Sequence, residues 1–330
     1  MTDNWGLIGH EWAVDMLRQH VANEMQRHAY LFTGPPGLGR RSLALAFARA
    51  LNCPQPPAPG EYCNSCRDCR QIAAMQHPDL HIIQADQEGG TLKVEQIREL
   101  RKGVLLSPYQ AKYRIVLLHR FQEANPSAAN ALLKTLEEAP SKVILLLTAD
   151  NAEQLLPTIV SRCEVIRLRS LSIPRVKKLL VEKGADDAKA QLIASLSAGR
   201  PGYALRLLED DSALEFRNEK LDEFEKLLAA SRVERFSYAE KLAKEKEGFR
   251  ETLILWLSLW RDVMMRVAGE DESIANFDRR ELIENLANRL NLAEAKKLLY
   301  TAENGVGQLK RNVNARLLAE VLLLDWPRSE

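Results

Sequence analysis

The fold class of this chain is decided by the stretch HAYLFTGPPGLGRRS, which covers residues 28–42. The first six residues are mostly apolar or aromatic and predict a short buried strand. A helical pattern follows from residue 42 to residue 51. Between strand and helix stand Gly34, Gly37 and Gly39, which allow backbone N–H groups to close around a phosphate at a helix N-terminus. The stretch therefore predicts a phosphate loop (P-loop) in an α/β domain.

The pattern around this loop extends to about residue 168. Apolar strand-like runs alternate there with amphipathic helical segments, which is typical of a parallel sheet covered by helices. We expect four more buried strands, at residues 80–84, 114–119, 143–148 and 164–168. The first domain is therefore predicted to be α/β and to cover residues 1–168.

The rest of the chain is predicted to be all-α and to form two further domains, because 330 residues are too many for one compact core. Residues 169–208 are typical of a small helical lid. Residues 209–330 are typical of a helical bundle. Within that bundle, residues 253–267 are apolar on nearly every side and include Trp256 and Trp260, as in a buried helix.

Composition excludes some classes of function. The formal net charge is +1, so no overall basic field would draw the chain onto nucleic acid. The longest apolar run, residues 252–259, is far shorter than the roughly 20 residues that a bilayer span needs. The N-terminal residues show no charged-then-apolar signal pattern. We therefore expect a cytoplasmic protein without a membrane segment.

The phosphate loop departs from the pattern of a working ATPase. Lysine is expected at position 40 and Ser or Thr at position 41, but Arg40 and Arg41 stand there. Ser42 comes one residue late, and this shift turns a helical side chain by roughly 100°. The hydroxyl that would hold Mg²⁺ is therefore absent or misdirected, although Arg40 could still contact a phosphate. We interpret Gly34, Gly37, Gly39 and Arg40 as a vestigial phosphate-binding loop.

The second strand of such a nucleotide site should end in acidic residues that hold Mg²⁺. Here residues 114–118 run into His119 and Arg120, and the first carboxylate is Glu123 in the following loop. Without a metal-binding acid the γ-phosphate charge is not neutralised for transfer. Two independent losses therefore predict that the chain does not hydrolyse ATP.

Two enzymatic alternatives remain open at this point. An active ATPase motor would require Arg40 to replace the lysine and Glu123 to replace the missing acid. A stand-alone P-loop kinase would require an acid that acts on its substrate, and none is visible in the sequence. ATP turnover by the purified chain would separate the first alternative from a subunit that only assembles with others.

Four of the five cysteines lie close together in the pattern C-x9-C-x2-C-x2-C, as Cys53, Cys63, Cys66 and Cys69. In a cytosolic chain such clustering indicates a metal site rather than disulfides. Four thiolates bind one tetrahedral Zn²⁺ and leave no open position for catalysis. We therefore predict a structural zinc module at about residues 53–69. Cys163 stands apart and is interpreted as a small buried residue.

Two later stretches are the most specific in the chain. Residues 130–140 read NALLKTLEEAP, and residues 158–163 read TIVSRC. Together they closely resemble the clamp-loader subunits of bacterial DNA polymerase III, delta-prime and gamma/tau, which are AAA+ proteins. The resemblance covers nearly the whole chain. Further matches lie at residues 8–10 (IGH), 77–79 (HPD) and 311–318 (RNVNARLL), of which the two triplets are weak alone.

Within this family the missing ATPase residues favour the delta-prime type. Gamma/tau motors resemble intact ATPases and carry a lid arginine that senses nucleotide, whereas residues 199–202 (GRPG) put glycine at that position. The resemblance implies a non-hydrolysing subunit that helps to load the sliding clamp onto primed DNA within the DNA polymerase holoenzyme. It implies gamma/tau and delta subunits as partners, contacted through the AAA+ faces and a C-terminal helical collar. Clamp and primer-template DNA would be met through the complex.

The resemblance also assigns a role to Arg162, the arginine of the Ser-Arg-Cys triplet. In this family it is a finger that enters a neighbouring subunit's ATP site. A guanidinium supplied in this way stabilises charge on the γ-phosphoryl oxygens. The alternative interpretation is a surface arginine in a structural ion pair, which is common and contributes little.

Overall fold

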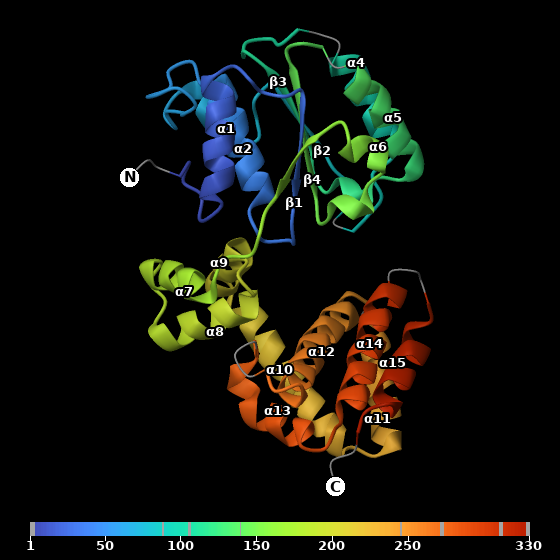
Figure 1. The fold of residues 1–330 in the computed structure, drawn as a ribbon. Coiled ribbons are helices and arrows are strands. Elements are labelled where there is room, and N and C mark those ends of the chain that lie inside the picture. The colour runs from blue at the N-terminus through green and yellow to red at the C-terminus, as the bar shows by residue number, and fades with distance from the viewer. Residues whose placement is uncertain are drawn as a thin grey trace. The chain divides into compact units, whose positions relative to one another are not determined.

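The computed structural model describes residues 4–87, 89–104, 107–138, 140–244, 246–270, 274–309 and 313–327. These residues form two compact units (Figure 1). The first comprises the chain up to Leu171 together with Arg200–Tyr203, and the second comprises Ser172–Gly199 and the chain from Ala204 onward. Ala139, Arg311 and Asn312, which belong to stretches used above, lie outside the described residues. The division into three domains stays a prediction.

The first unit is built on a five-stranded parallel sheet with the order β2-β3-β4-β1-β5. Its strands are β1 (Ala29–Thr33), β2 (Leu80–Ile83), β3 (Arg114–Leu118), β4 (Val143–Ala149) and β5 (Glu164–Arg167). Every residue of β1, β3 and β4 is buried, as expected of central strands in a parallel sheet that is covered on both faces. The prediction of an α/β fold with five strands is therefore confirmed.

Alternate side chains of the central strands enter two separate cores, because successive residues of a strand point to opposite faces. Tyr30 and Phe32 pack on the face that carries α1 (Glu11–Ala22), α2 (Arg40–Asn52) and α3 (Arg67–Ala73). Ala29 and Leu31 pack on the other face, which carries α4 (Val94–Val104), α5 (Pro126–Glu137) and α6 (Pro157–Val160). Short turns η1 (Phe121–Glu123) and η2 (Ala152–Gln154) follow β3 and β4. The sheet is thus the middle of three layers (Figure 1).

Asp79, the last residue of the His-Pro-Asp triplet, anchors the loop that leads into β3. Its buried carboxylate accepts hydrogen bonds from the backbone N–H groups of Tyr109, Gln110 and Ala111, at 2.6, 2.9 and 3.0 Å. Arg114 Nη2 lies 3.4 Å from the same carboxylate. The ring of His77 accepts the N–H of Asp79 at 3.0 Å. The triplet therefore has a structural role.

The second unit is helical throughout its described residues. Its helices are α7 (Ile173–Glu182), α8 (Asp187–Ser197), α9 (Pro201–Glu209, which begins in the first unit), α10 (Asp211–Ala229), α11 (Arg232–Ala243), α12 (Lys246–Val267), α13 (Arg280–Ala287), α14 (Leu292–Leu309) and α15 (Ala315–Leu324), with the turn η3 (Phe277–Arg279). Trp256 and Trp260 of α12 are buried at the centre of the bundle, as expected. None of the helices in the described part of the chain is both long enough and apolar enough to span a lipid bilayer.

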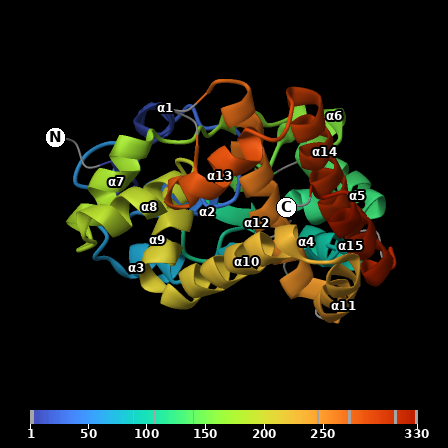
Figure 2. The ribbon, with the colours of Figure 1, turned by 90° about the horizontal axis from the view of Figure 1, so that it is seen from below.

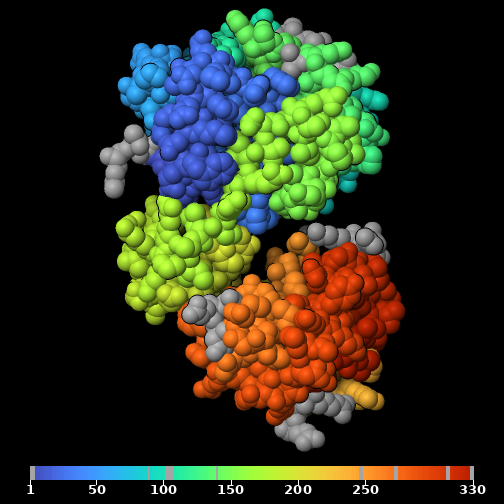
Figure 3. Space-filling view, in the orientation of Figure 1, coloured from blue at the N-terminus to red at the C-terminus, as the bar shows by residue number. Residues whose placement is uncertain are grey.

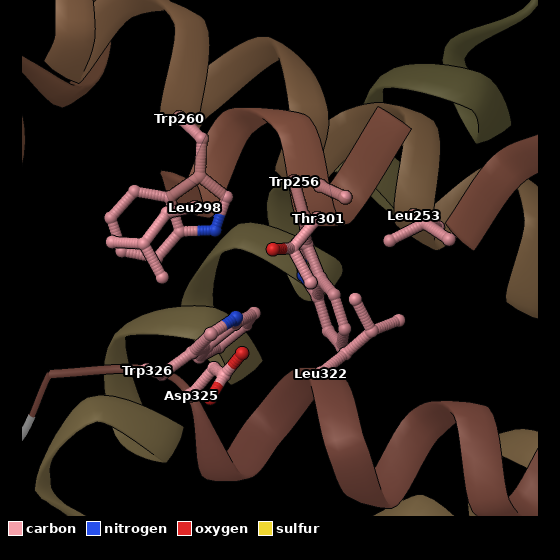
Figure 4. Close-up of a pocket in the computed structure, with 9 residues that line it drawn as sticks. Leu253, Trp256, Trp260, Leu298, Thr301, Leu322, Asp325 and Trp326 are labelled. Carbon is pink, nitrogen blue, oxygen red and sulfur yellow. The ribbon is translucent and has the colours of Figure 1, made fainter. Parts of the chain in front are cut away.

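The tryptophans of this bundle leave little space between them. Trp256, Trp260 and Trp326 surround a cavity of about 10 Å³, which Leu253, Leu298 and Leu322 also line (Figure 4). A space of this size holds one water molecule at most. The aromatic cluster is therefore packed core, in agreement with the helical apolar pattern.

A buried arginine joins the C-terminal ends of two helices of the same bundle. The guanidinium of Arg235 donates to the carbonyls of Leu227 and Leu228, at the end of α10, at 2.9 and 3.1 Å. It also donates to carbonyls at and beyond the end of α15, those of Leu323, Trp326 and Pro327. Because a helix C-terminus carries partial negative charge, one cation here stabilises two helix ends.

The first prediction concerns Asp79→Asn. Burial disfavours the carboxylate, but the three backbone N–H groups and Arg114 stabilise it more, so the pKa of Asp79 is lowered. Its stabilisation is therefore complete above the unfolded carboxyl pKa, about 3.9, and is lost as the pH falls through the lower folded value. We expect Asp79→Asn to reduce the free energy of unfolding of the first unit by about 3 kcal/mol at neutral pH, and by less in acid.

Urea unfolding at pH 7 and at the lowest pH where both chains stay folded measures this difference. Asp86→Asn, which changes an exposed carboxylate in the same unit, is the control and should have little effect at either pH. A destabilisation that does not shrink with falling pH would contradict the assignment.

Candidate functional site

The phosphate-loop backbone has the shape that its glycines predict. Gly34, Gly37 and Gly39 have φ values of +142°, +87° and +92°, in the region that favours glycine. A Cβ at Gly34 would lie 2.8 Å from the carbonyl oxygen of Leu168. Gly39 caps the N-terminus of α2. The sequence therefore identified the loop and its place between β1 and α2 correctly.

Arg40, which occupies the lysine position, is paired within the chain. Its side chain is only 9% exposed, and its Nη1 lies 2.8 Å from Oδ1 of Asp150, the residue that follows β4. A phosphate would have to compete with this carboxylate for the guanidinium. Arg41 and Ser42 are exposed on α2. The interpretation of Arg40 as a phosphate contact stays a prediction.

The start of α9 packs directly on the loop, within the first unit. The N–H of Gly202 donates to the carbonyl of Gly37 at 2.8 Å. A Cβ at Gly202 would lie 3.0 Å from that carbonyl oxygen, and a Cβ at Gly37 would lie 2.9 Å from Cβ of Tyr203. The guanidinium of Arg200 lies over the Tyr203 ring, 4.6 Å from its centre. A side chain at position 202, within the stretch 199–202, would therefore require the Gly37 carbonyl to shift by a few tenths of an ångström.

The end of β3 carries a hydrogen-bonded turn. Arg120 has a φ of +52°, and its N–H donates to Oγ1 of Thr148 at 2.8 Å. Its Nε lies 3.0 Å from Oε1 of Glu123, which also accepts the N–H of Gly89 at 3.0 Å. The carboxylate of Glu123 therefore contacts both Arg120 in this turn and the backbone of Gly89. The alternative in which Glu123 holds Mg²⁺ gains no support from this geometry.

Arg162 lies between α6 and β5 and is 36% exposed. Its Nη1 donates to the carbonyl of Thr158 at 2.9 Å, and its Nη2 donates to Oε1 of Glu137 at 2.7 Å. Glu137 is the last residue of α5. The side chain is therefore accessible to a partner and is held on two sides by its own chain.

The four clustered cysteines converge. Their sulfur atoms all lie within 4.8 Å of one another, which is compatible with the separation of about 3.8 Å around a tetrahedral Zn²⁺. Cys53 follows the last residue of α2, and Cys66 precedes the first residue of α3. Backbone N–H groups of Cys63, Cys66 and Cys69 donate to the sulfurs of Cys53, Cys63 and Cys66, at 3.4, 3.2 and 3.3 Å. The four cysteines could therefore hold a metal ion, and the all-sulfur donor set fits zinc.

The thiols of the cluster differ in their pKa values. Hydrogen bonds from Ser65 and from the backbone N–H of Cys66 lower the pKa of the Cys63 thiol to about 6. Burial raises the pKa of Cys69 and of Cys53. Since metal ligands must be deprotonated, binding would release protons from Cys53 and Cys69, the two thiols whose pKa is raised.

The cysteine segment is packed tightly on the surface of the first unit (Figure 3). A Cβ at Gly60 would lie 2.4 Å from the carbonyl oxygen of Arg18 in α1, so this contact requires glycine. The hydroxyl of Tyr62 donates to the carbonyl of Trp5 at 2.5 Å, and the guanidinium of Arg49 lies over the Tyr62 ring at 4.2 Å. This packing is consistent with a structural role. Cys163 is remote from the cluster, and burial raises its pKa to about 12.

Sequence reasoning missed three residues of these sites. Asp150 is the first polar residue after a long apolar strand, and that position was its only signal. Glu137 lies in the stretch 130–140, which was identified without a role for each residue. Tyr203, which packs on the phosphate loop, carried no signal because its partner lies far away in the sequence.

Known proteins resemble this chain over nearly its whole length. A family model described as DNA polymerase III, delta subunit, matches residues 9–172, and one for the C terminal part of that subunit matches residues 212–328. The chain is 31% identical over 326 residues to DNA polymerase III subunit delta' of Pseudomonas aeruginosa, with 96% of each chain covered. It is 27% identical over 313 residues to the Bacillus subtilis protein of the same name, with 94% and 93% covered.

More distant matches follow. Subunit tau of Bacillus subtilis is 32% identical over 244 residues, which are 72% of this chain and 42% of tau. Among solved structures, a gamma subunit-related protein of Thermotoga maritima is 18% identical, with a TM-score of 0.49 and coverage of 94% and 97%.

The second prediction concerns the metal. We expect the purified chain to carry one zinc ion, and we expect its removal to lower the melting temperature of the first unit by about 5 °C or more. Metal analysis before and after chelation, followed by thermal unfolding, measures both effects. Cys163→Ser is the matched control and should leave the metal content unchanged. An unchanged melting curve after verified removal of the metal would refute the structural role.

Proposed function

Since the chain belongs to the family of DNA polymerase III delta-prime subunits, we propose that it is a clamp-loader subunit that does not hydrolyse ATP and that acts through Arg162 on a neighbouring subunit's nucleotide. Membership of the clamp-loader complex follows from the family and from the similarity to gamma/tau subunits. The observation that carries the finer proposal is a contrast between two arginines. Arg40 is buried against Asp150, whereas the side chain of Arg162 is 36% exposed.

The absence of hydrolysis is supported by the groups around the loop. A working site needs a free cation at the β- and γ-phosphates, a hydroxyl for Mg²⁺ and a carboxylate at the end of β3. Here the cation is paired with Asp150, Ser42 is exposed one position late, and His119 and Arg120 follow β3. The lid contact through Gly202 further restricts the loop. No observation favours the motor alternative.

Assembly with gamma/tau and delta subunits is supported by an apolar surface on the C-terminal helices. Helices α11 and α15 lie side by side (Figure 2). They run antiparallel, since Arg235 reaches the carbonyl of Leu323 while Arg316 lies 3.4 Å from Glu240. Their outer faces expose large apolar side chains, namely Val233, Phe236, Leu317, Val321 and Leu324. We name these five residues the collar patch, and we propose that it meets a neighbouring subunit.

The zinc site, the sliding clamp and the DNA also belong to the proposed function. Zinc at the four cysteines would have a structural role. The sliding clamp and primer-template DNA would be contacted as part of the complex, because the chain itself has almost no net charge. Polymerase activity would belong to the holoenzyme.

The third prediction tests the action of Arg162. We expect the isolated chain to show no Mg²⁺-dependent ATP turnover. In a complex reconstituted with gamma/tau and delta, we expect Arg162→Ala to reduce ATP turnover at the site it serves by about 10³-fold or more. The total ATP turnover of the complex should then fall by the fraction that this one site contributes. Arg167→Ala, which removes an exposed arginine from the end of β5, should behave as wild type.

Wild-type turnover by the Arg162→Ala complex would refute the proposed role in trans. Turnover by the isolated chain that disappears on changing Arg40 would instead identify it as a motor.

The fourth prediction tests the collar patch. We expect Val321→Asp to weaken association with the partner subunits by at least about tenfold, because a charge would be buried in the contact. Val181→Asp on α7 is the matched control, since the two valines are 48% and 46% exposed. Binding is measured by titration against the partner subunits, and circular dichroism checks that both variants fold. Equal affinities for the two variants would show that the patch faces solvent in the complex.

A further inference from the structure

Glu137 occupies an unfavourable place for an acid. It is the last residue of α5, where the partial negative charge of the helix end opposes a carboxylate. Its side chain is 49% exposed, so burial does not require it to be there. An exposed ion pair contributes little to folding stability. Folding stability therefore gives little reason for an acid at this position, and its carboxylate accepts a hydrogen bond from Arg162.

The contact restricts a side chain that would otherwise sample more orientations. A long exposed arginine samples many rotamers, and ordering it when a ligand binds costs entropy. Here Nη2 is held by Glu137 and Nη1 by the carbonyl of Thr158. The hydroxyl of Ser161 donates to the same carbonyl at 3.2 Å. The guanidinium is thus held by a helix end on one side and by the single turn of α6 on the other.

These two contacts leave capacity for a ligand. A guanidinium has five N–H donors in one plane, and the contacts with Glu137 and Thr158 use two of them. Three donors remain, which suffice for a bidentate contact with phosphate oxygens. The orientation of the guanidinium plane determines where phosphate oxygens can be bound.

We propose that Glu137 is a positioning residue: it holds the Arg162 guanidinium in place before a neighbouring subunit's nucleotide meets it. This inference rests on the proposed function, because it concerns the same arginine. The bond to Thr158 comes from the main chain and persists in side-chain variants. Glu137 is therefore the part of the arrangement that substitution can remove.

The fifth prediction uses the complex reconstituted with gamma/tau and delta, and measures ATP turnover against ATP concentration. We expect Glu137→Ala to lower kcat at the served site by about tenfold, with KM for ATP changed less than about twofold, because orientation rather than binding is lost. Glu137→Gln should recover most of kcat, since the amide oxygen still accepts a hydrogen bond. Glu138→Ala, which removes the adjacent exposed carboxylate, should match wild type.

The double variant Arg162→Ala with Glu137→Ala provides the decisive comparison. If Glu137 acts through Arg162, the double variant equals Arg162→Ala alone, whereas independent roles would add. Loss of activity in Arg162→Ala with normal kinetics in Glu137→Ala would overturn the positioning role and leave the proposed function standing. A lower KM or a higher kcat in Glu137→Ala would also overturn it, by identifying Glu137 as a competitor of phosphate. Normal kinetics in Arg162→Ala would refute the proposed function itself.

Discussion

The parallel sheet of the first unit must be apolar on both faces, and the positions of the phosphate loop, Asp150, Asp79 and Arg162 follow from this constraint. Because β1, β3 and β4 are buried throughout, polar side chains are confined to the ends of strands. The carboxyl ends of β1 and β4 carry the phosphate loop and Asp150. The amino ends of β2 and β5 follow Asp79 and Arg162. The opposite ends of the strands of one sheet therefore separate the phosphate loop from Arg162.

Much of this arrangement could be predicted because its signals are local. Apolar runs identified all five strands, and the glycines identified the loop at residues 34–39. The spacing of the cysteines predicted that four sulfurs would converge. The partners of Arg40 and Arg162 could not be predicted, because Asp150 and Glu137 come from segments that only the folded sheet brings near. Sequence spacing carries no information about such pairs.

The two arginines show how environment determines the chemistry of one side-chain type. Arg40 and Arg162 carry the same charge, and each pairs with one carboxylate. At 9% exposure the pair of Arg40 is poorly screened by solvent, so a competing anion must displace Asp150 from a buried contact. At 36% exposure the pair of Arg162 is weak, and its guanidinium stays available to a partner. Burial, rather than residue type, thus distinguishes the two arginines: one guanidinium is enclosed with its carboxylate, and the other remains partly accessible to solvent.

The phosphate loop also shows that a glycine pattern can be required by packing alone. Gly34 and Gly37 adopt positive φ, and a Cβ at either position would collide with Leu168 or Tyr203. These glycines are therefore required by packing whether or not a nucleotide binds, whereas nothing in the packing requires lysine at position 40 or an acid after β3. Glycines in such a loop therefore indicate the path of the backbone. The charged residues beside them indicate whether the loop can support catalysis.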